Sequence, residues 1–441
     1  GSMQRTRRRL VGVVARWGAG ATGATALGAC GVPASGAPPA TARRAVTLQF
    51  WSRFPAPIQD VEEKNLPVFM ERSAPIKVER TLAAVDYGQL VEKITTAFAS
   101  DTAPDVFTMG SPDVVTYAHP GSALQLDAFP RVRKEAEDFF GPPLAVGRYK
   151  EKLYGLTYYI DTRIMVYRKD LLAEEGLPTD RKQLPKTWEQ FREVGRKLAK
   201  WEGGQLSRVG WDIATSGDAT QFMMMLAQQK KNIIAADGKR VEFDGPEGQR
   251  ALQTLVDFVH RDRLDSPQRP QFPSGVEALG TSMMAIKWTN SDILARIRRA
   301  QMEPDQTIVT DLSPEFSGQP TAASYMGGTW IMAAKGTKDT DATLDLVTYL
   351  TGLEHTLALA EATTTVPARK SAEKAPYLQN PLLRPFYESL QYGWSVPQHP
   401  KYAQIRAKVI EATREAMQQQ KGVGAALTDA GSYANALLAG S

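Results

Sequence analysis

Residues 86–110 read DYGQLVEKITTAFASDTAPDVFTMG, and this stretch decides the predicted fold class. Asp86 is a residue type that caps helices, and the apolar residues that follow it at every fourth position predict an amphipathic helix. The apolar run at 105–110 predicts a buried strand, and the alternating residues 46–52 predict an earlier one. Strands that alternate with helices are typical of an α/β domain with a largely parallel sheet.

The alternation continues in the second part of the chain. Thr187 can cap a helix whose apolar residues share one face, and residues 381–438 carry helical periodicity. Further strands are expected over 164–167, 282–288 and 329–334, and further helices over 251–259 and 344–350.

The first 29 residues have the order of an export signal. Residues 1–2 read as a scar left by a tag, and a basic segment then precedes a modest apolar run. The LGAC string that ends at Cys30 resembles the lipobox of bacterial lipoproteins, in which the cysteine is acylated. We therefore expect an export signal over 1–29, a lipid anchor on Cys30 and a Pro-rich flexible spacer over 30–44. Both twin-arginine and Sec export remain open.

The net charge of +5 belongs to the export signal. That segment holds five arginines and no lysine or acidic residue, so its removal leaves 5 − 5, or about zero. A near-neutral body gives no reason to expect nucleic-acid binding. The four histidines are scattered, and the GxGxxG string at 18–23 has no strand before it. We expect neither a metal nor a cofactor.

Four short strings occur in a fixed order along the chain: APDV at 103–106, LYGLTYY at 153–159, PKTWEQF at 185–191 and VPAR at 366–369. Together they resemble the extracellular solute-binding proteins that serve carbohydrate ABC importers, the group of maltose- and glycerol-phosphate-binding proteins. Thr157 departs from the proline that is usual in the second string. No single string is specific, and the resemblance depends on their order and spacing.

The resemblance implies a two-lobed α/β fold of the periplasmic-binding-protein type (type II), with the ligand in a cleft between the lobes. Hinges are then expected where the chain crosses between lobes, near Tyr159, Gly327 and Val366. The implied division is lobe 1 over 45–159 and 328–365, and lobe 2 over 160–327 and 366–441.

The implied function is capture of a sugar or oligosaccharide for the membrane subunits of an ABC importer. The protein would act as a monomer, without catalysis, anchored to the outer face of the cell membrane through Cys30. A phosphorylated polyol such as a glycerophosphodiester, or a peptide, is the alternative ligand. A lipid-anchored glycosidase is a remote alternative, since paired carboxylates cannot be recognised without geometry.

Sugar sites need flat aromatic rings beside carboxylates, amides and guanidinium groups, so such residues at strand ends are the candidates. The loop from Trp288 is the best case, and the resemblance implies a stacking aromatic there. Asp86 could instead serve only as a helix cap, and Trp330 only as packing. The predicted ligand-binding residues are Trp51, Arg53, Asp86, Tyr87, Ser111, Asp113, Tyr158, Asp161, Trp288, Asn290, Asp292, Tyr325, Gly327, Gly328, Tyr392 and Trp394.

Overall fold

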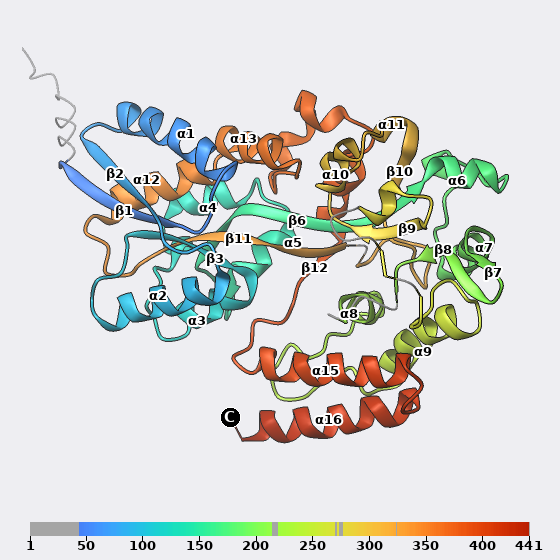
Figure 1. The fold of residues 1–441 in the computed structure, drawn as a ribbon. Coiled ribbons are helices and arrows are strands. Elements are labelled where there is room, and N and C mark those ends of the chain that lie inside the picture. Colours follow the sequence, from blue (N-terminus) through green and yellow to red (C-terminus); the bar gives the residue numbers. More distant parts are fainter. Residues whose placement is uncertain (1–43, 214–218, 270, 273–276, 323, 441) are drawn as a thin grey trace, which may run out of the picture. The chain divides into compact units, whose positions relative to one another are not determined.

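The computed structural model (Figure 1) describes residues 44–213, 219–269, 271–272, 277–322 and 324–440. The predicted export signal, the acylation site Cys30 and nearly all of the predicted spacer lie outside these residues.

The strands in the described residues are β1 (Val46–Ser52), β2 (Ile76–Leu82), β3 (Val106–Gly110), β4 (Arg148–Tyr149), β5 (Lys152–Leu153), β6 (Gly155–Arg168), β7 (Lys200–Glu202), β8 (Gln205–Trp211), β9 (Met284–Thr289), β10 (Ile308–Asp311), β11 (Ser324–Ala333) and β12 (Gly393–Trp394). The α-helices are α1 (Ile58–Arg72), α2 (Tyr87–Ala99), α3 (Val114–Ala118), α4 (Pro130–Ala136), α5 (Gly141–Val146), α6 (Lys169–Glu174), α7 (Trp188–Leu198), α8 (Thr220–Ala227), α9 (Pro246–His260), α10 (Ile293–Arg299), α11 (Pro304–Thr307), α12 (Thr340–Leu350), α13 (Leu353–Thr363), α14 (Arg384–Glu388), α15 (Tyr402–Met417) and α16 (Val423–Ala439).

The main sheet is mixed, so the prediction of a largely parallel sheet is wrong. Its strands follow the order β2-β1-β3-β11-β6-β9-β8-β7, with β12 beside β11 and β10 beside β6. The pairs β1–β2, β1–β3 and β8–β9 are parallel, whereas β3–β11, β11–β6 and β6–β9 are antiparallel. The reason is that two long strands, β6 and β11, run in opposite directions through the middle of the sheet (Figure 1).

Helix starts follow the capping residues that the sequence indicates. The Thr187 side chain accepts from the main-chain N–H of Gln190, whose own side chain reaches back, which makes a complete capping box for α7. Asp86 caps α2 by accepting from the N–H of Gln89 at 2.9 Å. Both helices were predicted, and both are confirmed.

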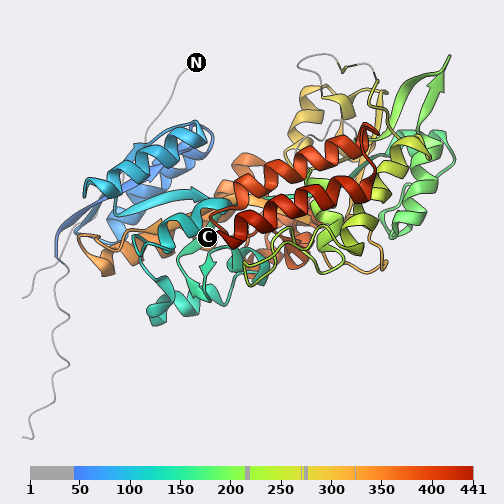
Figure 2. The same cartoon turned by 90° about the horizontal axis from the view of Figure 1, so that it is seen from below.

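The predicted helical stretch over 381–438 is interrupted. After α14 the chain forms β12 and an irregular loop before α15 and α16, which pack against each other and against α9 (Figures 1 and 2). Pro397 and Pro400 explain the break, because proline lacks the N–H that a helix interior requires.

Two clusters of buried apolar residues form the core. The first gathers around β1, β3, β11 and the helices α1, α2 and α12, and it includes the buried apolar residues between Val366 and Leu390. The second gathers around α7, α8, α9, α15 and α16. The lobe boundaries stated above remain a prediction, and the segment 366–390 packs with the first cluster.

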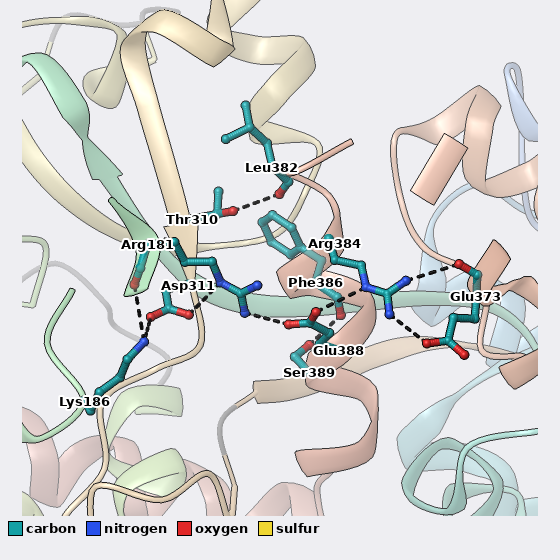
Figure 3. Close-up of polar contacts among 10 residues, drawn as sticks. All are labelled: Arg181, Lys186, Thr310, Asp311, Glu373, Leu382, Arg384, Phe386, Glu388 and Ser389. Carbon is teal, nitrogen blue, oxygen red and sulfur yellow. Dashed lines mark hydrogen bonds and ion pairs between the residues drawn. The ribbon is translucent and has the colours of Figure 1, made fainter. Parts of the chain in front are cut away.

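Hydrogen bonds and ion pairs attach this segment near both of its ends. At one end, Arg369 pairs with Glu135 and Asp138, each at 3.0 Å. At the other, Thr310 of β10 donates to the carbonyl of Leu382 at 3.0 Å. Charged side chains extend this second attachment in a row, in the order Lys186, Asp311, Arg181, Glu388, Arg384 and Glu373 (Figure 3).

None of the described helices combines the length and the apolar character needed to cross a membrane.

Candidate ligand-binding site

The strand β6 presents one polar face that is accessible and one face that is buried. Tyr159, Asp161 and Arg163 are half-buried, whereas the residues between them are buried. This follows from the alternation of side chains along a strand, which places every second residue on the same face. The accessible face of β6 therefore carries an aromatic ring, a carboxylate and a guanidinium group in a row, which we call the polar row (Tyr159, Asp161 and Arg163).

The neighbouring strand β11 presents glycines and an aromatic ring to this row. Tyr325 pairs with Arg163, and Gly327 pairs with Asp161. Gly328 has a φ of 155°, and a Cβ there would lie 2.4 Å from the carbonyl oxygen of Tyr159. Glycine is thus required at position 328 for the two strands to approach as they do.

Asp161 is the most unusual group in this row. Its Oδ2 accepts from the Asn290 side chain at 3.1 Å, whereas Oδ1 is buried and has no hydrogen-bond partner among the described residues. Burial raises the pKa of Asp161 to about 6, and the positive charge of Arg163 offsets only part of that effect. The carboxylate therefore has an acceptor oxygen to spare.

Aromatic rings surround the Arg163 guanidinium. Its central carbon lies 5.6 Å from the ring of Trp288 and 5.3 Å from the ring of Tyr325, which in turn meets Trp394 edge-on at 5.3 Å. The Trp288 indole N–H donates to Ser313 at 3.1 Å. The indole N–H of Trp394 is buried and has no acceptor within the described chain.

The loop after β9 supplies a second carboxylate that is already neutralised. Asp292 pairs with Arg296 at 3.0 Å, and Arg296 also pairs with Glu277 at 3.2 Å. Asn290 accepts from the same arginine at 3.4 Å while donating to Asp161. Of the two aspartates, only Asp161 lacks an ion-pair partner within hydrogen-bond distance among the residues described.

We call the residues at the ends of β1 and β3 the second wall of the candidate site, because Phe54 among them contacts Tyr159 of β6. The Arg53 guanidinium carbon lies 4.9 Å from the Phe54 ring and 5.3 Å from the Tyr87 ring. The Tyr87 hydroxyl donates to Asp113 at 2.6 Å. Phe54 also meets Tyr159 with ring centroids 5.7 Å apart, which joins this wall to β6. Burial raises the pKa of the Tyr159 phenol. The carboxylates of Asp161 and Asp292 raise it further, and the positive charge of Arg53 lowers it.

The structure therefore brings together most of the predicted ligand-binding residues. They are Arg53, Tyr87, Asp113, Asp161, Trp288, Asn290, Asp292, Tyr325, Gly327, Gly328 and Trp394.

Other predicted residues lie elsewhere or have a different partner. Asp86 is exposed and caps α2, and Trp51 lies under the Lys93 ammonium, 5.1 Å from its ring, in a separate pocket along α2. Ser111 is buried at the end of β3. Tyr392 is half-buried just before β12.

Tyr158 lies in the core. It is 2% exposed and donates to Glu62 at 2.6 Å, with His355 stacked beside it at 5.6 Å. The sequence analysis missed its neighbour Tyr159 and also Arg163. Strand alternation could have found them, since Tyr158 and Asp161 are three positions apart on one strand and so face opposite sides.

In the part of the chain that the structure describes, no group of three or more histidine, cysteine, aspartate or glutamate side chains could hold a metal ion.

The family model "Bacterial extracellular solute-binding protein" matches residues 68–385. The chain belongs to this family. The solute-binding protein is 23% identical over 185 residues to the arabinooligosaccharide-binding protein of Bacillus subtilis, which is 42% of this chain and 41% of that one. The chain spans less than two thirds of the length of the curated relatives that it matches.

Solved structures share the fold of this solute-binding protein. The sugar-binding protein MalE of Xanthomonas citri is 22% identical with a TM-score of 0.79, over 89% of this chain and 98% of that one. UgpB of Mycobacterium tuberculosis, solved with glycerophosphocholine, is 18% identical with a TM-score of 0.71, over 90% of this chain and 99% of that one. The two-lobed α/β fold predicted from the sequence is confirmed.

Proposed function

We propose that this solute-binding protein captures a sugar or oligosaccharide outside the cytoplasm and delivers it to an ABC importer. The observation that carries the proposal is the buried, unpartnered Oδ1 of Asp161 beside the aromatic group of Trp288, Tyr325 and Trp394. A sugar offers hydroxyl donors to a carboxylate and apolar C–H faces to aromatic rings, so it satisfies both features at once. The names of the relatives, which bind oligosaccharides, support the same class.

Hinge motion between two lobes would let the ligand enter and then exclude water from it. The strands β6 and β11 carry both the predicted crossings near Tyr159 and Gly327 and the polar row. Closure around one solute would then present a ligand-dependent surface to the importer, and a monomer suffices for this mechanism.

We propose binding without catalysis. Asp292 is held in an ion pair with Arg296, so among the described residues of the β6 side only Asp161 has a buried carboxylate oxygen without a partner. A glycosidase requires two carboxylates with separate acid and base or nucleophile roles. Prolonged incubation with each bound oligosaccharide should leave it intact, as judged by chromatography of the products.

Export and anchoring through Cys30 complete the proposal. A Cys30→Ser variant expressed with its signal should appear in the soluble fraction outside the cell, whereas the parent chain should sediment with membranes. Both should bind ligand with the same affinity, since none of the proposed ligand-binding residues lies in the predicted anchor and spacer segment, 30–44. Lost affinity in the variant would contradict this separation of roles.

A thermal-shift screen tests the capture function directly. Neutral arabino-, galacto-, malto- and chitooligosaccharides, uronate oligosaccharides, glycerophosphodiesters and short peptides are each added at millimolar concentration. A bound solute raises the melting temperature by mass action. If no small solute raises it, while a macromolecular partner does, the proposed function is wrong.

A further inference from the structure

Arg53, in the candidate site, is a cation without an anionic partner among the residues that the structure describes. It lies at the end of β1, half-buried, and its main-chain N–H donates to Oγ1 of Thr108 at 3.2 Å. The guanidinium group lies between the rings of Phe54 and Tyr87. Its Nε is buried, and no described residue accepts a hydrogen bond from it.

This protein otherwise pairs its buried arginines with carboxylates. Removing a guanidinium group from water is unfavourable, and a nearby carboxylate compensates for the lost hydration. Examples among the described residues are the pairs Arg80–Glu62, Arg168–Asp170, Arg208–Glu175 and Arg369–Glu135. The side chains of these four arginines are between 4% and 9% exposed. Half-buried arginines such as Arg192 and Arg296 also pair with carboxylates, whereas Arg53, which is half-buried too, has no carboxylate partner among the described residues.

The carboxylate of Asp113, which lies on this wall, already accepts hydrogen bonds from other residues. Oδ2 of Asp113 accepts from the Tyr87 hydroxyl at 2.6 Å, and Oδ1 accepts from Thr116 at 3.3 Å. The Tyr87 phenol also accepts from the N–H of Gly110 at 3.1 Å, so its ring is held in place beside Arg53. Asp113 thus orients the tyrosine and leaves the guanidinium group available.

We propose that the captured solute carries an oxyanion, either a carboxylate or a phosphate, and that this group pairs with Arg53. The inference rests on the proposed function and narrows its ligand to acidic saccharides, which carry either a uronate carboxylate or a sugar phosphate. Two aromatic rings hold the guanidinium group, and its planar set of N–H donors matches the oxygens of either anion. Asp161 on the other wall would accept a hydroxyl group of the same ligand.

Matched ligands and variants test the proposal. Trigalacturonate is compared with its fully methyl-esterified form, which has the same sugar and linkage without the charge. Glycerophosphocholine, a hexose phosphate and neutral oligosaccharides form the remaining arms, and each is titrated by calorimetry. The proteins are the parent chain, Arg53→Gln, Arg53→Lys and the control Lys93→Gln. Lys93 is a comparable cation over a ring, but its ammonium group already donates to the carbonyl of Ala83 at 3.0 Å.

The expected result is that the tightest ligand is anionic and that Arg53→Gln weakens it by on the order of 10- to 100-fold. Arg53→Lys should recover part of the loss, and Lys93→Gln should bind like the parent. The unliganded melting temperature of Arg53→Gln should change little, because the substitution breaks no ion pair and removes only two contacts with aromatic rings. Tighter binding of trigalacturonate would identify the anion as a carboxylate, and tighter binding of a phosphate ligand would identify it as a phosphate.

Two other results have separate meanings. A neutral oligosaccharide as tightest ligand, or an equal effect of Arg53→Gln on charged and esterified ligands, would overturn the anion proposal and leave sugar capture standing. If no solute in any arm binds, both the proposed function and this inference fail.

Discussion

The side chain of Asn290 donates to one oxygen of Asp161 at 3.1 Å, and the other oxygen of that carboxylate is buried with no partner among the described residues. A single amide thus holds the carboxylate in one orientation and leaves its second oxygen for a ligand. Such a group is expected to weaken the unliganded protein, because a buried polar atom without a partner is unfavourable.

Replacement of Asp161 by asparagine should stabilise the unliganded protein in neutral solution and weaken ligand binding. Burial raises the pKa of Asp161 from its ordinary 3.8 to about 6, so the folded protein binds the proton more tightly than the unfolded chain does. Stability therefore falls as the pH rises from about 4 to about 6 and stays lower above that. Asp161→Asn should gain up to about 3 kcal/mol above pH 6 and nothing below pH 4. Urea unfolding at pH 4 and pH 8 measures the difference.

Asp170→Asn is the matched control for this prediction. Although burial opposes it, hydrogen bonds from Arg168 hold the pKa of Asp170 below its ordinary value. The ionised carboxylate of Asp170 stabilises the fold above its ordinary pKa, and this stabilisation is lost in acid. Asp170→Asn should therefore be less stable than the parent at pH 8, whereas Asp161→Asn should be more stable. If Asp161→Asn unfolds at a lower urea concentration than the parent at pH 8, the ionised Asp161 carboxylate does not destabilise the fold, and the prediction is wrong.

Trp288→Phe and Trp394→Phe should differ in their effect on stability. The first removes the N–H donor to the buried hydroxyl of Ser313, which should reduce the free energy of unfolding by about 1 kcal/mol beyond packing losses. The second removes an N–H that has no acceptor among the described residues of the unliganded protein. Trp394→Phe should instead lower ligand affinity. Chemical unfolding and calorimetric titration of both variants separate the two effects, and equal stability losses would argue against this distinction.

Gly328→Ala should be much more damaging than Gly327→Ala. A Cβ at position 328 would lie 2.4 Å from the carbonyl oxygen of Tyr159, whereas one at 327 would lie 3.4 Å from a carbon of the Tyr325 ring, which can move. We expect a loss on the order of 2 to 4 kcal/mol at 328 and under about 1 kcal/mol at 327. Melting temperatures of the two purified variants provide the comparison. A Gly328→Ala protein as stable as Gly327→Ala would show that β6 and β11 are not packed as described.

Two substitutions can decide whether Asp86 serves only as a helix cap or also contacts the ligand. Asn is as good a helix cap as Asp, so Asp86→Asn should keep the stability of the parent, whereas Asp86→Ala should lose about 1 kcal/mol. Ligand affinity should be unchanged in both, because the exposed carboxylate acts only on α2. If Asp86→Asn binds its ligand more weakly at unchanged stability, Asp86 contacts the ligand after all.

The sequence predicts the fold well because its four strings occur in order over most of the folded body, and helix caps such as Thr187 are local signals. The mixed sheet could not be predicted, since the pairing of β6 with β11 joins residues that are far apart in the chain. Among the site residues, Arg53 could be predicted as a polar group at a strand end, and Asp161 as a polar group near a predicted crossing, although it lies inside β6. Their lack of ion-pair partners among the described residues could not be predicted, because only the folded structure shows which charged groups lie nearby.

The register of β6 against β11 has a consequence for how this protein can be changed. Tyr325 pairs with Arg163 and Gly327 pairs with Asp161, so the strands proposed to contact the solute are also the strands expected to bend. Substitutions there would alter recognition and flexibility together. A biosensor built from this chain, or a descendant that adapts to a new nutrient, would gain independent control of selectivity by varying the loops that carry Asn290 and Arg53 instead.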